Sequence, residues 1–275
     1  MPIIHAIILG IVQGLSEFLP ISSSGHLTVV PWLFRWHEFD GNASLEKSFD
    51  LALHLGTFLG AFAYFGKDVL RYVAAAWRSI RNRRVQTTDE RVAWLLLVAS
   101  IPAAALGVAF DSSISDNRRM WLIGVCMVIF GVVLGVVDHR AKGTLQADDL
   151  RWQDAALIGA AQAVSLQPGV SRSGSTITAG RLLGFDRPAA VRLSFLMSLP
   201  ITAGAALYKL AKQLSGDGIP IAYRPAFVWG AVVSAMVGFA AITALLRFVR
   251  TRSFTPFVIY RIVAGVLVLV VWAAR

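Results

Sequence analysis

The chain has few charged residues and a single cysteine. Only 15% of its 275 residues are Asp, Glu, Lys or Arg, whereas soluble domains average about 25%. Its one cysteine, Cys126, excludes a disulfide within the chain. No Lys or Arg precedes the first apolar stretch, so we do not expect the basic n-region of a cleaved signal peptide. These shortages exclude a disulfide-stabilised domain and argue against an ordinary soluble one.

Apolar residues are abundant and occur in long runs. Hydrophobic residues make up 56% of the chain, and the mean hydropathy is +0.63. A bilayer-spanning helix needs about 20 consecutive apolar residues. The sequence therefore predicts an all-α, polytopic membrane protein that forms a single membrane domain over 1–275. The six expected transmembrane helices cover residues 48–66, 91–110, 119–137, 190–211, 225–248 and 255–273.

Two further apolar regions, 2–35 and 153–185, are interrupted in the middle. The first contains Pro20 and the run 22–25 (Ser-Ser-Ser-Gly), and the second contains 168–174 (Pro-Gly-Val-Ser-Arg-Ser-Gly). Proline and glycine interrupt helices. Irregular backbone at membrane depth is tolerated only where protein buries it or where it lines a cavity. We therefore expect two re-entrant helical hairpins.

The two interrupted regions resemble each other after a shift of 149 residues. The shift superimposes Gly10 on Gly159, Gln13 on Gln162, Ser16 on Ser165, Ser22 on Ser171, Ser24 on Ser173 and Gly25 on Gly174. Three expected spans follow each region, and an odd number of spans inverts the second copy. This pattern predicts an inverted-topology repeat, about 1–140 and about 150–275. Two unrelated Gly- and Ser-rich breaks are the alternative.

The net charge of +10 could suggest nucleic acid, but the basic residues lie at the ends of apolar runs. Of the 26 Lys and Arg residues, 16 fall in four segments that share one side if 67–91 is cytoplasmic: 67–91, 138–152, 181–192 and 247–252. Eight fall on the other side, and Arg172 and Arg261 lie at membrane depth. Positive-inside topology explains this bias, so we expect no nucleic-acid partner.

Ionisable residues inside a membrane are candidates for function because burying charge is costly. The strongest candidates are Glu17, His26, Arg172 and Arg261, and the weaker ones are Asp50 and His54. Gln13 and Glu17 are four residues apart and share a helix face. They could hold a divalent cation, Glu17 could act as a base, or the two could form a polar pair between helices.

Hydroxyl groups surround both interruptions. They belong to Ser22, Ser23, Ser24, Ser171, Ser173 and Thr176. Hydroxyls and free N–H groups at a helix start suit a phosphate, and Arg172 could bind it bidentately. His26 could transfer protons. Helix capping by the serines, a packed histidine and a structural Arg172–Glu17 pair are the alternatives. Together these groups favour a phosphorylated, amphiphilic substrate with a divalent cation.

At these residues the chain resembles a known family. Residues 13–26 (QGLSEFLPISSSGH) resemble the first signature of the undecaprenyl-diphosphate phosphatases, the bacitracin-resistance family. That signature has Glu or Gln, three residues, then Glu, so Gln13 is the allowed variant. Residues 168–174 resemble the second signature, and 49–57 and 254–261 resemble other family segments. The resemblance covers nearly the whole chain.

The resemblance implies an enzyme of the bacterial plasma membrane that hydrolyses undecaprenyl diphosphate to the monophosphate and recycles a lipid carrier for cell-wall glycans. It also implies a divalent cation, Mg²⁺ or Ca²⁺, and a site that opens towards the extracytoplasmic side. Glu17, Ser23, His26 and Arg172 match the family's essential residues by position. Gln13, Ser22, Ser24, Ser171, Ser173 and Thr176 surround them. Either Ser23 or water could be the nucleophile.

Two alternatives were compared with this interpretation. Lipid phosphatases related to acid phosphatases and haloperoxidases also contain Ser-Gly-His, which Ser24-Gly25-His26 matches. They further require a histidine and an aspartate where this chain has Thr178 and Leu182, which excludes them. A transporter that flips the polyprenyl phosphate is the remaining alternative, because inverted repeats with broken helices are typical of transporters. The oligomeric state is left open.

Overall fold

The structure, a computed structural model, describes residues 1–36, 38–109, 119–213 and 218–275. Its α-helices are α1 (Ile3–Phe18), α2 (Ser23–Phe34), α3 (Ala43–Asn82), α4 (Thr88–Val98), α5 (Ile101–Ala109), α7 (Met120–Arg140), α8 (Trp152–Val164), α9 (Arg172–Leu182), α10 (Arg187–Gln213), α11 (Arg224–Phe248) and α12 (Thr255–Ala274). Short 3₁₀ helices are η1 (Glu38–Gly41), η2 (Ala147–Asp149) and η3 (Ile221–Tyr223). In these ranges the β structure consists of one isolated bridge, Leu145 with Phe185. The expected all-α fold is confirmed.

Six helical stretches of the described chain are long and apolar enough to cross a membrane. They are Ala43–Asn82, Thr88–Ala109, Met120–Arg140, Arg187–Tyr208, Ile221–Phe248 and Thr255–Ala274. Each contains or closely overlaps one predicted span, so the six-span prediction is confirmed. Residue 110, the predicted end of one span, lies outside the described residues.

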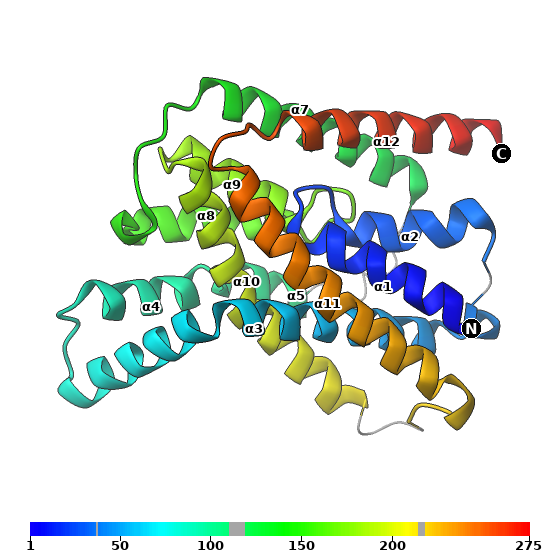
Figure 1. The fold of residues 1–275 in the computed structure, drawn as a ribbon, viewed down its shortest axis with the longest axis horizontal. Helices are drawn as coiled ribbons and strands as arrows, with labels where there is room; N and C mark the ends of the chain where they lie inside the picture. The colour runs from blue at the N-terminus through cyan, green and yellow to red at the C-terminus, as the bar shows by residue number, and fades with distance from the viewer. Residues whose placement is uncertain (37, 110–118, 214–217) are drawn as a thin grey trace.

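Helix α3 is much longer than the predicted span 48–66. Its 40 residues correspond to about 60 Å at 1.5 Å per residue, roughly twice the hydrocarbon thickness of a bilayer. The expected loop 67–91 is therefore mostly helical. Its stretch 73–77 (Val-Ala-Ala-Ala-Trp) is rich in alanine, the best helix former, and the helix continues where the sequence becomes polar. In Figure 1, α3 and α4 form a hairpin that projects from one end of the molecule.

The predicted span 91–110 is divided into α4 and α5 by a bend at Ala99 and Ser100. Pro102 follows the bend, and its ring nitrogen has no hydrogen to donate to the preceding turn. The Ser100 hydroxyl donates to the Leu96 carbonyl at 3.0 Å. The Gln162 side chain of α8 donates to the Ala99 carbonyl at 3.2 Å. Helix α8 therefore packs at the bend and satisfies a backbone group there.

Glycines let pairs of helices approach closely. Helix α1 packs along α11, α11 along α3, and α8 against α4 and α5. A methyl group on Gly10 would lie 2.7 Å from the Gly230 carbonyl oxygen of α11, and one on Gly159 would lie 2.7 Å from the Ala99 carbonyl oxygen of α4–α5. Gly10 and Gly159 are matched positions of the predicted repeat. Both matched glycines thus lie at close helix contacts, while the repeat and its inverted arrangement stay predictions.

The two interrupted regions form the expected helix–turn–helix pairs, α1–α2 and α8–α9. In Figure 1, α1 and α2 approach the middle of the molecule from the end where the N-terminus lies, and α8 and α9 approach it from the opposite end. Their turns meet in the middle, which places residues about 150 positions apart in one region. Their re-entrant arrangement in a bilayer stays a prediction.

Replacing Gly56 by alanine should destabilise the protein. The added methyl would lie 2.2 Å from the Ala231 carbonyl oxygen, and overpacking typically costs about 1–3 kcal/mol. Gly66→Ala in the same helix is the matched control, because a methyl there has no neighbour within 4 Å. We expect the apparent Tm in detergent to fall for Gly56→Ala and to hold or rise for Gly66→Ala. Equal Tm values for both variants would contradict the packing.

Candidate functional site

Each turn is held by a serine in an unusual backbone conformation. Ser22 has φ 80° and Ser171 has φ 77°, a region that residues other than glycine rarely adopt. The Ser22 hydroxyl accepts hydrogen bonds from the N–H groups of Gly25 at 3.4 Å and Gly169 at 3.1 Å. The Ser171 hydroxyl accepts one from Gly174 N–H at 3.1 Å. Both serines therefore act as helix caps. Capping was the alternative, in the sequence analysis, to the predicted contact of these serines with substrate.

The two turns are also bonded to each other. The Gly169 N–H reaches Ser22 of the first turn, and the Ser173 hydroxyl donates to the Leu19 carbonyl at 3.0 Å. Arg261 of α12 donates to carbonyl groups of both turns. Arg261, a candidate for function in the sequence, therefore uses its donors inside the protein instead of presenting them to a ligand.

Glu17, near the end of α1, is the centre of the site. Its side chain is 7% exposed. The Oε1 atom accepts a hydrogen bond from Arg172 Nη2 at 2.8 Å. The Oε2 atom accepts one from the Ser23 hydroxyl at 2.6 Å and one from Gln13 Nε2 at 3.1 Å. The structure thus brings together three of the four residues that match the family's essential set, and Gln13 with them.

Helix α3 contributes two more groups beside the same carboxylate. His54 Nε2 lies 3.8 Å from Glu17 Oε2, while its Nδ1 bonds to the Asp50 carbonyl at 2.7 Å. The Thr57 hydroxyl lies 3.5 Å from Gln13 Nε2. From the sequence, His54 was only a weaker candidate for function, and Thr57 was not predicted to belong to the site. Their spacing of three residues places both on one helix face. That spacing is the feature of the sequence from which Thr57 could have been predicted to lie beside His54.

Both ring nitrogens of His26 have partners other than the Glu17 carboxylate. Its Nδ1 lies 2.7 Å from the Ser22 carbonyl oxygen, and its Nε2 lies 2.7 Å from the Tyr260 hydroxyl. A carbonyl can only accept, so Nδ1 carries the proton. The His26 and Tyr260 rings stack with centroids 5.6 Å apart. Within the described residues no hydrogen bond joins His26 to Ser23 or Glu17, so its role in proton transfer stays a prediction.

The other predicted substrate-binding residues make internal contacts. The Thr176 hydroxyl donates to the Arg172 carbonyl at 2.8 Å and lies 2.7 Å from the hydroxyl of Ser194 in α10. Ser24 takes part through its main chain, whose carbonyl accepts a bond from the Thr28 hydroxyl. Thr176 therefore helps to hold the helix turn that carries Arg172. Contact of these side chains with substrate stays a prediction.

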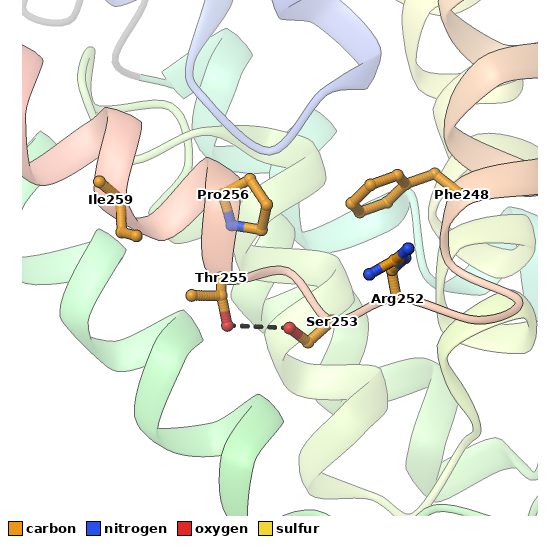
Figure 2. A pocket seen from close by; sticks show the side chains of 6 residues that line it. All are labelled: Phe248, Arg252, Ser253, Thr255, Pro256 and Ile259. Atoms are coloured by element: carbon orange, nitrogen blue, oxygen red, sulfur yellow. Dashed lines mark hydrogen bonds between the residues drawn. The ribbon is translucent and has the colours of Figure 1, made fainter.

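A small crevice between α1, α3, α9 and α10 borders the Glu17 carboxylate. It is lined by Glu17, Phe18, Thr57, Phe58, Ala61, Arg172, Ser198, Leu199 and Thr202. A wider hollow lies elsewhere, where α11 is connected to α12 (Figure 2). Its lining residues are Phe248, Arg252, Ser253, Thr255, Pro256 and Ile259. It contains no carboxylate, so the crevice, though smaller, is the better candidate for the reaction.

Among the residues that the structure describes, two buried polar atoms at the site have no hydrogen-bond partner, Gln13 Oε1 and Arg172 Nη1. Buried polar groups are nearly always paired, so both are suited to bind something from outside the chain. The described residues contain no group of three or more His, Cys, Asp and Glu side chains that could hold a metal. Mg²⁺ is often bound by one or two protein oxygens together with substrate phosphates and water. Gln13 and Glu17 supply oxygens of the kind that this mode of binding uses, and a cation held by both would require the Gln13 amide to turn, because its Nε2 faces Glu17 in the structure.

The comparisons with known proteins cover almost the whole chain. The family described as "Bacitracin resistance protein BacA" matches residues 6–267. The undecaprenyl-diphosphatase of Pelobacter propionicus is 43% identical over 272 residues, which are 96% of this chain and 95% of the relative. Those of Pelotomaculum thermopropionicum and Moorella thermoacetica are each 42% identical over all of this chain, with 98% and 100% of their own lengths covered. The chain belongs to the bacitracin resistance protein BacA family.

Proposed function

We propose that this membrane protein hydrolyses undecaprenyl diphosphate to undecaprenyl phosphate and inorganic phosphate, and so recycles the lipid carrier used in cell-wall synthesis. The observation that carries the proposal is the Glu17 carboxylate, which binds the Ser23 hydroxyl on one oxygen and the Arg172 guanidinium on the other. A hydroxyl, a carboxylate and a guanidinium group therefore meet in one place, and in this proposal they are the nucleophile, the base and the phosphate-binding cation. The three relatives named above are called undecaprenyl-diphosphatases.

In the proposed reaction the Ser23 oxygen attacks the terminal phosphorus of the lipid diphosphate. Its proton passes to Glu17 Oε2, which already accepts that hydrogen bond at 2.6 Å. The bond between phosphorus and the bridging oxygen breaks, and undecaprenyl phosphate leaves. Water then attacks the phosphoserine, Ser23 regains its proton from Glu17, and phosphate is released. The alternative is direct attack by water, with Glu17 as its base.

Arg172 holds the diphosphate in this proposal. Its Nη1 atom is buried and has no partner within the described part of the chain, while Nη2 bonds to Glu17. A guanidinium group binds phosphate oxygens through parallel N–H donors. Substrate binding would therefore satisfy the free Nη1 atom and would share Arg172 between the phosphate and the carboxylate.

The cation of the proposal is Mg²⁺ or Ca²⁺, held by Glu17 and Gln13 Oε1. When bound, it would neutralise negative charge on the phosphate oxygens. The site is proposed to face the extracytoplasmic side of the bacterial plasma membrane, as the family resemblance implies, and the charge bias of the loops supports a cytoplasmic position for the segment 67–91.

Lipid transport remains less well supported than hydrolysis. The relatives compared above are named as a hydrolase. A hydroxyl–carboxylate hydrogen bond beside an arginine is useful for phosphoryl transfer, whereas moving an intact lipid does not require it.

Replacing Ser23 by alanine or Glu17 by glutamine should abolish most turnover. Both changes remove the proton transfer from the hydroxyl to the carboxylate, and such steps contribute about 10²–10⁴-fold to rates. The measurement is phosphate release from undecaprenyl diphosphate by purified protein in detergent. Thr243→Val, which alters an exposed hydroxyl on α11, is the control that should keep its activity. Substantial turnover by Ser23→Ala would exclude Ser23 as the nucleophile, and an inactive, folded wild type would exclude the function.

The Mg²⁺ concentration needed for activity should depend on the side chain at position 13. A chelator should stop phosphate release, and added Mg²⁺ should restore it. Gln13→Glu offers a second carboxylate and should lower the Mg²⁺ concentration for half-maximal activity, whereas Gln13→Leu should raise it. Titrating Mg²⁺ against activity for the three proteins measures the shift. Turnover that a chelator leaves unchanged would rule out the proposed cation.

A further inference from the structure

Arg261 is a fully buried cation without a carboxylate partner in the described chain. Its side chain is 0% exposed, and the four hydrogen bonds that it donates within the described chain all go to main-chain carbonyl groups. The ion pairs found among the described residues do not include it. Burying a charge is costly unless it is paired and hydrogen-bonded. Packing alone therefore does not explain why an arginine occupies this position, because an apolar side chain would fill the space at a lower cost.

The carbonyl groups that Arg261 binds come from both turns and from α7. Its Nη1 donates to Pro20 at 3.2 Å in the first turn. Its Nη2 donates to Gly169 and to Val170, both at 2.9 Å, in the second turn. Its Nε donates to Met127 of α7 at 3.2 Å. A planar guanidinium group can reach several acceptors at once, whereas a lysine ammonium is a single point charge.

The bonded carbonyls lie directly beside the residues of the site. Pro20 is three residues from both Glu17 and Ser23, and Val170 is two residues before Arg172. The bonds from Ser23 and Arg172 to Glu17 form only if the two turns keep their relative position. Arg261 contributes to that position from a third element, α12, which belongs to neither turn.

We propose that Arg261 is a positioning residue for the reaction, because it holds the two turns in the register that places Ser23 and Arg172 on the two oxygens of Glu17. This inference rests on the proposed hydrolase function and deepens it. Arg261 does not touch the reacting atoms. It acts through the backbone of 19–22 and 165–171, so its loss should affect the rate of the chemical step more than the binding of substrate.

A second buried arginine provides a matched control. Arg181 is 4% exposed, and it donates to Asp138 at 3.1 Å and to the carbonyls of Phe185 and Ala141, both at 2.7 Å. It joins the end of α9 to α7 and bonds to neither turn. Arg181→Lys and Arg261→Lys are therefore the same chemical change in similarly buried sites, and only one of them touches the turns.

The test compares kcat, KM and Tm of the wild type and the two lysine variants, with undecaprenyl diphosphate as substrate. Misplacing catalytic groups by about 1 Å can cost about 10²-fold in rate, so we expect a loss of that order in kcat for Arg261→Lys with little change in KM. Arg181→Lys should lower Tm and keep its kcat.

Equal kcat losses in both variants, or none in Arg261→Lys, would overturn the positioning role while wild-type turnover still supports the hydrolase. An inactive wild type would instead overturn the hydrolase and this inference with it.

A milder pair of variants covers the case in which Arg261→Lys does not fold. Gly131 and Gly135 both lie on α7 against α12. A methyl on Gly131 would lie 3.0 Å from Arg261 Cβ, and one on Gly135 would lie 3.0 Å from Val258 Cγ1. Gly131→Ala should lower kcat more than Gly135→Ala, because it displaces Arg261. The same kcat in both variants would overturn the proposal.

Discussion

The structure depends on one constraint, that backbone groups freed where a helix is broken inside the protein must find partners there. The turns at 19–22 and 165–171 meet it in two ways. Ser22 and Ser171 accept hydrogen bonds from free N–H groups, and Arg261 donates to free carbonyl groups. Hydroxyls, N–H groups and guanidinium groups are also what a phosphate binds. Ser22, Ser171 and Arg261 use these groups to satisfy the broken helices, so the groups left to meet a phosphorylated lipid are Arg172 Nη1, which has no partner in the described chain, and the Ser23 hydroxyl.

Small residues then determine which helices can reach the site. Gly56 and Gly60 bring α3 so close to α11 that a methyl on either would lie within 2.4 Å of a carbonyl oxygen. Helix α1 approaches α11 in the same way through Gly10. Because α1 and α3 pack against the same helix, His54 and Thr57 of α3 lie beside Glu17 and Gln13 of α1. Replacing these glycines would therefore disturb the site as well as the packing.

Much of this arrangement could be predicted from the sequence because its signals are local. Apolar length predicted the six spans, and Pro20 and the Ser-Gly runs predicted both breaks. The cost of charge at membrane depth singled out Glu17 and Arg172. Features that depend on tertiary contacts were not predicted, namely the bend at Ala99 and Ser100 and the direction of the His26 ring. Helix α3 exceeded its predicted span because apolarity marks where a helix meets lipid, not where it ends.

The charges at the site also explain why the proposal includes a cation. Two guanidinium groups, Arg172 and Arg261, and one carboxylate, Glu17, leave one net positive charge around the turns when all are ionised. A phosphate monoester alone carries about −1.5 to −2 at neutral pH, and a diphosphate presents at least as much charge. Binding the substrate would thus leave excess negative charge in a buried place, where it is costly. A divalent cation beside Gln13 Oε1 would offset that excess, which links the unpartnered oxygen of Gln13 to the charge of the lipid.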